Sequence, residues 1–472
     1  MRQTPLRDAR RGVAFPTSAS SLDALDVRGV FPAEIDARYA HRLGSAVARQ
    51  AQRLDSRAVV VSRDGRSSSV ELSAALQAGI RAGGVNVIDV GMAPTPLAQF
   101  AAVLHDVDVT VAVTGGQLPA TYNGFKLAFD GKPADAPTWR QLHDDFESPE
   151  DDTRMPGHRT TMNVLQCYLT RVAADIRIER SMKIAVDCGN GVCGAVAAPF
   201  FDAIGCETVG LFTEVDGAFP NHLPDPCVPE NLQDLVYCLR YSDCELGLAF
   251  DGDGSRLGVV TKSGRIVWPD RQLILFARDL LARKPGARIV YDVKSSRNVA
   301  RDIAAHGGSA HMAASGRSAI RHAMTADDAL LGGEMCGHLF FRERWYGFED
   351  AFYAAARLLE LVSRVDDASA LLDALPQSCA TPEIRLPGAE REKRALVARL
   401  QAQGTFQGAQ SVVALDGLRV DYADGFGLAR ASRSGIGLVF RFEGDSESAL
   451  ARIQGQFRKQ LLNVAPDLEL PF

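Results

Sequence analysis

The sequence predicts an α/β fold in which several α/β domains are followed by a smaller C-terminal α+β domain. The chain has 472 residues, more than a single hydrophobic core accommodates. Between residues 58 and 298, short β-branched runs repeatedly end in polar loops and are followed by patterns of helical spacing. From about residue 378 this alternation stops, and strands and helices follow in a different order.

The strand–loop–helix pattern carries most of the polar residues of interest. It occurs in "AVVVSRDGRSSS" (58–69), "VTVAVTGGQ" (109–117), "KIAVDCGNGVCG" (183–194), "LGLAFDGDGSR" (246–256) and "RIVYDVKSSRN" (288–298). Apolar residues at spacings of three and four predict helices over 69–84 and 270–284. Ligands of open α/β sheets gather at the carboxyl ends of the strands, so we expect these loops to converge on one cleft.

The C-terminal region is expected to form a compact α+β unit. Helices are predicted over 391–403 and 446–462, and strands over 417–432 and 436–444. These changes of pattern place domain boundaries near residues 160, 265 and 377.

Composition and charge narrow the class of protein. A net charge of −6 gives no basic signature for nucleic acid, and no run of about 18 apolar residues predicts a membrane span. The nine cysteines are scattered without C-x-x-C spacing, which argues against zinc and disulfide frameworks. We therefore expect a reduced, cytoplasmic protein that binds neither nucleic acid nor membranes.

The stretch "VAVTGGQLPATYNGFKL" (111–127) has the pattern of a strand that delivers a loop to a phosphate group. Its small residues allow backbone N–H groups to approach an anion, and Lys126 follows. Where such a loop would carry a nucleophile, however, it reads Gly115-Gly116-Gln117.

The stretch "DGDGSR" (251–256) indicates a metal or phosphate contact. Asp251 and Asp253 alternate with glycines after an apolar run, an arrangement that suits a hard divalent cation, and Arg256 follows. Ser255 stands where a third carboxylate would fit, so any such site is expected to be weakened. The alternative is a solvated turn.

Two further loops carry candidate ligand contacts. In "LLGGEMCGHLFF" (330–341), Glu334 and His338 could hold sugar hydroxyls or transfer protons, or His338 could be a buried structural histidine. In "LARASRSGIG" (428–437), the arginines and hydroxyls could form a phosphate clamp or an exposed basic turn; they are Arg430, Ser432, Arg433 and Ser434.

Basic residues also stand at the ends of two predicted strands. Arg63 and Arg66 flank Asp64 in "SRDGRSSS", and Lys294 holds the same position in "YDVKSSR". They are candidates for contacts with an anionic ligand, although each alone is more often a surface charge.

Together these loops resemble the α-D-phosphohexomutase superfamily, most closely bacterial phosphomannomutase/phosphoglucomutase. The resemblance covers nearly the whole chain and is carried in order by "DVRGV" (26–30), "SRDGRSSS" (62–69), "YNGFKL" (122–127), "DCGNGV" (187–192), "DGAFPNHLPDP" (216–226), "DGDGSR" (251–256), "YDVKSSR" (291–297) and "GGEMCGHLFFRERWYGFED" (332–350).

The resemblance implies three α/β domains with mixed sheets and a smaller C-terminal α+β domain around a central cleft. The expected limits are 1–162, 163–265, 266–377 and 378–472. It also implies phosphoryl transfer between the 1- and 6-positions of a hexose, with mannose or glucose phosphates as substrates, a phosphoserine and Mg²⁺.

The chain departs from the family pattern at the centre of that chemistry. The family loop reads Thr-Ala-Ser-His-Asn-Pro, so Gly116 occupies the phosphoserine position and Gln117 replaces the histidine. Of the three aspartates that hold Mg²⁺ with the serine phosphate, Asp251 and Asp253 remain, and Ser255 replaces the third.

Departures are also found around the rest of the implied site. The clamp keeps Arg430 and Ser432 but has Arg433 and Ser434 in place of a family Asn-Thr pair. Arg317 replaces a ligand-facing histidine, Cys336 replaces a serine of the sugar loop, and Leu25 replaces an aromatic residue; kept positions are Arg28, Lys126, Arg256, Lys294, Glu334 and His338.

The resemblance and its gaps predict a hexose phosphate-binding protein with lost or greatly reduced mutase activity and with weak or absent Mg²⁺ binding. One alternative is an active mutase or phosphatase with another phosphate acceptor. Another alternative is a structural role in which this chain assembles with an active mutase. The sequence does not identify that second protein.

Overall fold

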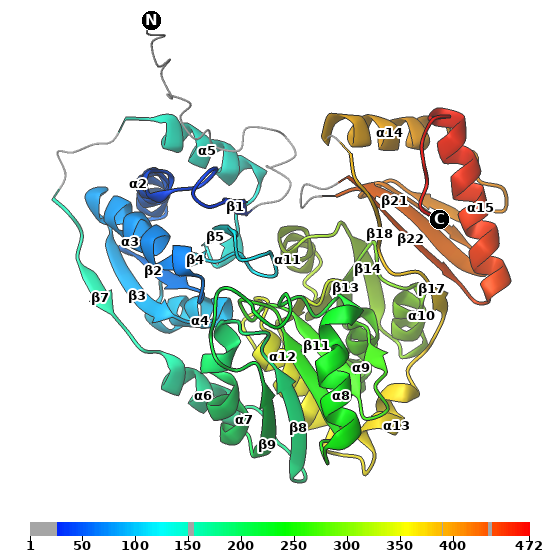
Figure 1. Ribbon diagram of the computed structural model, residues 1–472, viewed down its shortest axis with the longest axis horizontal. Helices are drawn as coiled ribbons and strands as arrows, with labels where there is room; N and C mark the ends of the chain where they lie inside the picture. Colours follow the sequence, from blue (N-terminus) through cyan, green and yellow to red (C-terminus); the bar gives the residue numbers. More distant parts are fainter. Residues whose placement is uncertain (1–25, 150–154, 389, 433–436) are drawn as a thin grey trace, which may run out of the picture.

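The computed structural model describes residues 26–149, 155–388, 390–432 and 437–472. Within them the chain forms four β-sheets, each covered by helices. We name the parts that carry them unit I (27–161), unit II (165–267), unit III (269–373) and unit IV (379–464). Units I and IV lie at the two upper corners of Figure 1, and units II and III fill the space below and between them. Leu25, Arg433 and Ser434 lie outside the described residues.

Unit I contains a seven-stranded mixed sheet in the order β1-β5-β4-β2-β3-β7, with β6 paired to β5. Its strands are β1 (Val27–Val30), β2 (Ala58–Arg63), β3 (Asn86–Met92), β4 (Val109–Val113), β5 (Tyr122–Phe129), β6 (Lys132–Pro133) and β7 (Arg159–Thr161). Its helices are α2 (Ala37–Arg53), α3 (Ser67–Ala82), α4 (Thr95–His105) and α5 (Ala136–Glu147). The β2 strand runs parallel to β3 and β4, whereas β5 runs antiparallel to β4 and β1.

Unit II contains a five-stranded mixed sheet in the order β12-β11-β10-β8-β9. Its strands are β8 (Met182–Asp187), β9 (Cys206–Leu211), β10 (Leu246–Phe250), β11 (Leu257–Thr261) and β12 (Ile266–Val267). Its helices are α6 (Leu165–Ala173), α7 (Ala197–Ala203) and α8 (Gln233–Tyr241), with short 3₁₀ turns at Val192–Ala195 and Pro229–Leu232. Because β12 pairs with β11, the second sheet extends just beyond residue 265.

Unit III contains a four-stranded mixed sheet in the order β14-β13-β15-β16. Its strands are β13 (Arg288–Asp292), β14 (Ser309–Ala313), β15 (Leu331–Gly333) and β16 (Leu339–Phe341). Its helices are α9 (Pro269–Arg283), α10 (Arg297–Ala305), α11 (Arg317–Ala326), α12 (Ala351–Val362) and α13 (Ala368–Asp373).

Unit IV contains an antiparallel sheet in the order β17-β22-β21-β20-β19, with β18 paired to β22. Its strands are β17 (Cys379–Ala380), β18 (Ile384–Leu386), β19 (Ser411–Val413), β20 (Leu418–Tyr422), β21 (Gly425–Ala431) and β22 (Leu438–Gly444). Its helices are α14 (Glu390–Gln403) and α15 (Glu447–Val464). The predicted fold class, three α/β domains with mixed sheets and a C-terminal α+β domain, is confirmed.

Local sequence signals account for where several helices begin. The helix predicted over 446–462 is α15, and the hydroxyl of Ser446 accepts a hydrogen bond from the N–H of Ala449 at its start. The Asp36 carboxylate caps α2 in the same way through Tyr39. The helices predicted over 69–84, 270–284 and 391–403 form as α3, α9 and α14, each within a few residues of its expected limits.

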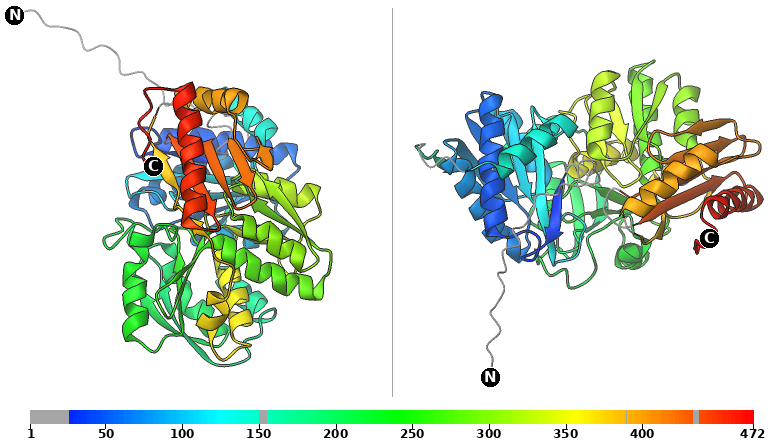
Figure 2. Two further views of the ribbon diagram at one scale, coloured as in Figure 1. Left: turned by 90° about the vertical axis from the view of Figure 1, so that its right-hand side faces the viewer. Right: turned by 90° about the horizontal axis from the view of Figure 1, so that it is seen from above.

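One large apolar cluster spans units I, II and III, whereas most of unit I and unit IV each have a core of their own. The shared cluster includes the buried face of α4 in unit I, the α7 helix of unit II and nearly all of α12 in unit III. Unit IV builds a separate core between its sheet and α15, and touches unit III through a small cluster of Val293, Phe426 and Leu428. Figure 2 shows unit IV at the opposite end of the molecule from unit I.

None of the helices in the described part of the chain has both the length and the apolar character that crossing a membrane requires.

Candidate functional site

Three of the predicted loops meet at the junction of units I, II and III. Gly116 lies between β4 and β5, Gly252 and Ser255 lie between β10 and β11, and Glu334 lies between β15 and β16. A Cβ placed on Gly252 would lie 2.4 Å from the carbonyl oxygen of Gly116, so units I and II are in close contact here. Ser255 Oγ lies 3.4 Å from His338 Nε2, which connects unit II with unit III.

The loop that contains Gly116 is held in place by Arg66, which is only 1% exposed. The guanidinium of Arg66 donates to the carbonyl oxygens of Gly116 (2.8 Å), Leu118 (2.6 Å), Pro119 (2.5 Å) and Tyr122 (3.0 Å), and to the Asp64 carboxylate (3.1 Å). Arg66 is therefore neither a surface charge nor a contact that is open to a ligand. It is a structural residue that shapes the loop.

Glycines at positions 115 and 116 suit this loop geometry. A Cβ on Gly115 would lie 2.4 Å from Cζ of Arg66, so the guanidinium occupies the space that a side chain would need. Gly116 has φ +55°, in the left-handed region that favours glycine, while a Cβ there would meet Arg28 at an ordinary 3.6 Å. The N–H of Gly116 donates to Thr114 Oγ1 at 2.8 Å.

Lys126, Asp251, Asp253 and Ser255 form a buried group that we call the carboxylate cluster. Ser255 Oγ lies 3.1 Å from Asp251 Oδ2 and 2.8 Å from Asp253 Oδ1. The other oxygen of Asp251 accepts the backbone N–H groups of Ser255 (2.8 Å) and Arg256 (3.0 Å). These bonds orient both carboxylates toward the serine hydroxyl.

The ammonium group of Lys126 lies inside the carboxylate cluster. Its Nζ is 2.6 Å from Asp253 Oδ2 and 2.9 Å from Ser255 Oγ. Burial alone would raise the pKa of Asp253, but Lys126 outweighs burial and holds it below its ordinary value. Burial and the neighbouring Asp253 carboxylate raise the pKa of Asp251 to about 6.

The carboxylate cluster offers only part of what Mg²⁺ requires. Carboxylate and hydroxyl oxygens are the right ligand type, but the cluster supplies two carboxylates and an uncharged hydroxyl. Asp253 Oδ2 is already occupied by Lys126 and by the hydroxyl of Thr95 at 2.8 Å. The residues as arranged therefore do not fit a complete Mg²⁺ site.

Glu334 and His338 form a hydrogen-bonded pair in the 334–338 loop. His338 Nδ1 lies 2.8 Å from Glu334 Oε2, and Glu334 Oε1 accepts the N–H of Gly316 at 2.5 Å. Burial disfavours the imidazolium of His338, yet Cys336 and Glu334 raise its pKa to about 10. Burial opposes the charge of Glu334 too, but His338 lowers the pKa of that carboxyl to about 2.

The other predicted cationic contacts are paired with acids. Lys294 Nζ lies 2.7 Å from Glu383 of unit IV, and Arg430 lies 2.9 Å from Asp416. Ser432, the neighbour of Arg430 in the predicted clamp, is buried.

Arg317, Arg28 and Arg256 are likewise held by the protein. Arg317 contacts Glu349 at 3.0 Å and also pairs with Asp26 of unit I. Arg28 donates to the carbonyl oxygen of Thr114. Arg256 lies 3.8 Å from Asp251 and 3.9 Å from Asp225.

Sequence reasoning missed the structural roles of three residues that organise this region, although it named Arg66 as a candidate for a ligand contact. Arg66 supports the Gly116 loop, and Thr95 donates to Asp253 from the start of α4. Asp416 accepts the N–H of Ser315 at 3.0 Å and so connects units III and IV beside Arg430. No helix was predicted at Thr95, and Asp416 stands in a stretch without a motif.

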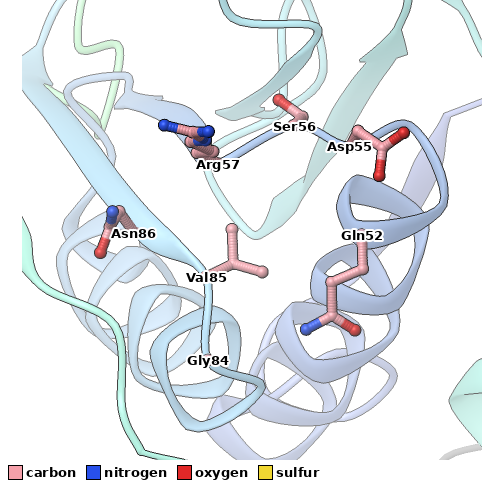
Figure 3. A pocket seen from close by; sticks show the side chains of 7 residues that line it. All are labelled: Gln52, Asp55, Ser56, Arg57, Gly84, Val85 and Asn86. Carbon is pink, nitrogen blue, oxygen red and sulfur yellow. The ribbon is translucent and has the colours of Figure 1, made fainter.

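The hollow shown in Figure 3 lies at the opposite edge of the first sheet. It has a volume of about 640 Å³ and is lined by Gln52, Asp55, Ser56, Arg57, Gly84, Val85 and Asn86. These residues lie before β2 and at the start of β3, at the amino ends of the strands, whereas the loops described above follow the carboxyl ends. Gln52 donates to the carbonyl oxygen of Gly83 at 2.7 Å, so part of the lining is structural.

The fold and the site together define a class: this is a multidomain α/β protein. Its candidate site lies at the junction of units I, II and III, where loops from the strand ends meet around buried acidic and basic side chains. Models of the phosphoglucomutase/phosphomannomutase alpha/beta/alpha domains I, II and III match residues 21–152, 166–264 and 268–379. The chain belongs to the phosphoglucomutase/phosphomannomutase family, as the sequence predicted.

Relatives along almost the full length support this assignment. A phosphoglucomutase of Neisseria meningitidis is 43% identical over 454 residues, covering 95% of this chain and 98% of the relative. A phosphomannomutase/phosphoglucomutase of Pseudomonas aeruginosa is 42% identical over 455 residues, covering 96% and 98%. A crystal structure of a family protein from Burkholderia thailandensis has a TM-score of 0.91 and 47% identity, covering 96% of this chain and all of that one.

Proposed function

We propose that this protein binds hexose phosphates, of the mannose or glucose type, and that its mutase activity is lost or greatly reduced. The relatives named above are phosphoglucomutases or phosphomannomutase/phosphoglucomutases. Gly116 stands at the position where their family resemblance places a reactive serine, and a glycine offers no hydroxyl to phosphorylate.

The position of Lys126 is the observation that carries this proposal. Its ammonium group lies 2.6 Å from Asp253 and 2.9 Å from Ser255, within the oxygen cluster that the resemblance assigns to Mg²⁺. A protein cation therefore neutralises the charge that a divalent ion would otherwise neutralise. Phosphoryl transfer depends on positioning and on electrostatic stabilisation, and both a nucleophile and a metal are needed for the standard reaction.

The 334–338 loop supports the binding part of the proposal. Glu334 and His338 are buried, hydrogen-bonded to each other and oriented by further contacts, as expected for groups that hold sugar hydroxyls. Lys294, Arg256 and Arg430 supply positive charge nearby, and a bound phosphate would share or displace their acidic partners.

Thr114 does not favour the alternative of another phosphate acceptor. Its hydroxyl donates to Asp64 Oδ2 at 2.8 Å and accepts the N–H of Gly116, and the residue is buried. The test below therefore also distinguishes two alternatives: phosphorylation of another residue, and a purely structural role beside an active mutase.

Turnover and binding measurements test the proposal directly. The protein is assayed with glucose 1-phosphate and mannose 1-phosphate in the presence of a hexose bisphosphate activator, and binding of the same sugars is measured by calorimetry. We expect binding without turnover, and an intact mass without phosphate. A phosphorylated residue that turns over with substrate would contradict the proposal, and an absence of binding would favour a structural role.

We also propose that Mg²⁺ binding is weak or absent. The charge of the ligand set is a main determinant of affinity for such ions, and Ser255 contributes none. Ser255→Asp should therefore strengthen Mg²⁺ binding measured by calorimetry by about tenfold or more. Cys336→Ser, which leaves the carboxylate cluster unchanged, is the control, and an equal effect of both substitutions would contradict the proposal.

A further inference from the structure

Three side chains of the 334–338 loop bring different metal-ligating atoms to one place. The carboxylate of Glu334, the thiol of Cys336 and the imidazole of His338 each offer one ligand atom, and these atoms lie within 4.8 Å of one another. Both neighbours approach the same nitrogen: His338 Nδ1 is 2.8 Å from Glu334 Oε2 and 3.4 Å from Cys336 Sγ. Nδ1 carries at most one hydrogen, so it can donate a hydrogen bond to only one of these two atoms at a time.

The two distances from His338 Nδ1 are close to those of a tetrahedral metal centre. Zn–S and Zn–N bonds of about 2.3 Å and 2.0 Å at a tetrahedral angle put sulfur and nitrogen about 3.5 Å apart. The observed distance between Cys336 Sγ and His338 Nδ1 is 3.4 Å. Glu334 Oε2 and His338 Nδ1 would have to separate by about half an ångström, as their direct hydrogen bond is replaced by two bonds to the metal.

The surrounding groups orient the ligands as the supporting groups of a metal centre do. Glu334 Oε1 accepts the N–H of Gly316, which leaves Oε2 directed at His338. His338 Nε2 faces Ser255 Oγ at 3.4 Å, so this nitrogen has a partner while Nδ1 binds a metal. Glu334 and His338 are buried but Cys336 is partly exposed, which gives an ion a route of entry and leaves a coordination position open.

The ligand set discriminates among cations. A thiolate and an imidazole suit Zn²⁺ and similar transition metals, whereas Mg²⁺ requires a shell of oxygens. A thiolate and a carboxylate balance the charge of a divalent ion, although Arg256 and Lys294 also act electrostatically on Cys336 and oppose a cation. We propose that Glu334, Cys336 and His338 form a site for Zn²⁺ or a similar divalent transition metal, separate from the carboxylate cluster.

Metal titration of the full chain tests this proposal. Cobalt(II) is added to the reduced protein in the presence of excess Mg²⁺, and the thiolate-to-cobalt charge-transfer absorption is recorded; Zn²⁺ should then displace it. We expect one equivalent per chain. Cys336→Ser should abolish the absorption and weaken Zn²⁺ binding by at least about 100-fold, since losing a supporting group alone costs about 10–100-fold.

Two other cysteines provide matched controls. Cys167 is exposed on α6, and Cys227 Sγ lies 3.0 Å from the carbonyl oxygen of Cys336. Cys167→Ser and Cys227→Ser should leave the absorption unchanged, whereas His338→Gln should remove the nitrogen ligand and weaken binding. Absorption that survives Cys336→Ser, or that depends on either control cysteine, would overturn the assignment.

The titration contains no phosphosugar, so its failure would leave the proposed binding function standing. A second experiment measures Zn²⁺ binding in the presence of glucose 1-phosphate. It rests on the proposed binding function, because the same side chains would hold the sugar. Glucose 1-phosphate should then weaken Zn²⁺ binding to the wild type. Zn²⁺ binding that is unchanged by a sugar shown to bind would instead confirm the metal site and remove Glu334 and His338 from the sugar contact.

Discussion

The carboxylate cluster and the 334–338 loop lie side by side but neutralise their charges in different ways. In the cluster, Asp253 pairs with the Lys126 ammonium, and both buried carboxylates contact the Ser255 hydroxyl. In the loop, Glu334 is paired with His338, and the partly exposed Cys336 stands beside them. In the carboxylate cluster, Asp253 of unit II is neutralised by Lys126 of unit I. In the loop, Glu334 is neutralised by His338, which lies only four residues further along the chain.

Ser255 is the contact between these two groups, and its size explains how they fit together. Its hydroxyl lies 2.9 Å from Lys126 Nζ and 3.4 Å from His338 Nε2. A carboxylate at this position would attract both cations and add a negative charge between them. We therefore expect the residue at position 255 to influence whether the junction holds a divalent ion or the Lys126 ammonium group alone.

The largest expected effect comes from restoring both missing groups together. Gly116→Ser alone should give little mutase turnover, because Ser255 still leaves the metal ligands incomplete. Ser255→Asp alone should also give little, because Gly116 still offers no hydroxyl. The pair should exceed either single variant by about 100-fold or more in kcat/KM for glucose 1-phosphate with bisphosphate, and Gln117→His should add to it.

Strain at residue 116 needs its own control in that series. Gly116 has φ +55°, which costs a serine about 1 kcal/mol, and Gly131 has a similar φ of +62° with open space around it. Gly131→Ser should therefore reproduce the loss of stability without any change of turnover. Wild-type turnover already at about 1–10³ s⁻¹ would show that another residue carries the phosphate.

The next largest effect is expected from removing the internal cation. Lys126→Met leaves Asp253 buried without its charge partner, so the free energy of unfolding should fall by about 3–5 kcal/mol. Millimolar Mg²⁺ should restore part of this loss in the variant and have a smaller effect on the wild type.

A surface ion pair provides the comparison for that variant in denaturant titrations. Lys132 lies 2.8 Å from Asp130, and both side chains are exposed. Lys132→Met should change the free energy of unfolding by about 1 kcal/mol or less. A loss equally small for Lys126→Met would show that the buried pair is not a substitute for a metal ion.

A smaller effect, on sugar affinity, is expected from removing the negative charge of Glu334 in the 334–338 loop. Glu334→Gln keeps the shape of the side chain but removes the charge that faces His338, so affinity for glucose 1-phosphate should fall by about 10-fold. Gly116→Ser should leave this affinity within a factor of about two. Calorimetry on both variants separates the two regions, and equal losses would contradict the comparison.

The smallest expected effect is on the pH dependence of the free energy of unfolding. It comes from the ion pair between Lys294 and Glu383, which lies outside the 334–338 loop. Lys294 lowers the pKa of Glu383 to about 2. A lowered carboxyl pKa stabilises the folded state above the ordinary value of about 4.5, and this contribution is lost as the pH falls toward 2. Wild type should exceed Glu383→Gln by about 1 kcal/mol in thermal unfolding at pH 7 and by less at pH 3. A difference that does not vary with pH would refute this.

The sequence predicted the fold class and the convergence of the loops for simple physical reasons. Buried strands leave β-branched runs, and ligand-binding loops follow the carboxyl ends of strands, so Gly116, Asp251 and Glu334 were found as loop residues. The three loops follow strands of three different sheets, so their meeting depends on how the units pack. The sequence did not show that Arg66 binds four carbonyl groups some fifty residues away, or that Lys126 enters the carboxylate cluster. Such contacts depend on tertiary distances, which leave no periodic pattern.

The argument from cysteine spacing does not bear on the site proposed at the 334–338 loop. The absence of C-x-x-C pairs argued against a zinc framework, and that argument concerns small domains that fold around a metal. Glu334, Cys336 and His338 converge because the loop between β15 and β16 turns back within a few residues. Mixed ligand types at alternate positions were the available signal.

The attachment of unit IV has a consequence for how the molecule comes apart. Units II and III share one continuous apolar cluster and should unfold together, while unit I joins this cluster mainly through α4 and keeps a core of its own. Unit IV is joined to unit III by polar bonds, such as Ser296 to Glu443 at 2.9 Å, and by a few apolar side chains. Polar contacts between units are typical of interfaces at which units can move relative to each other. Because Arg430 belongs to unit IV, a ligand that contacts both Arg430 and the 334–338 loop would join units III and IV and stabilise one arrangement of the two.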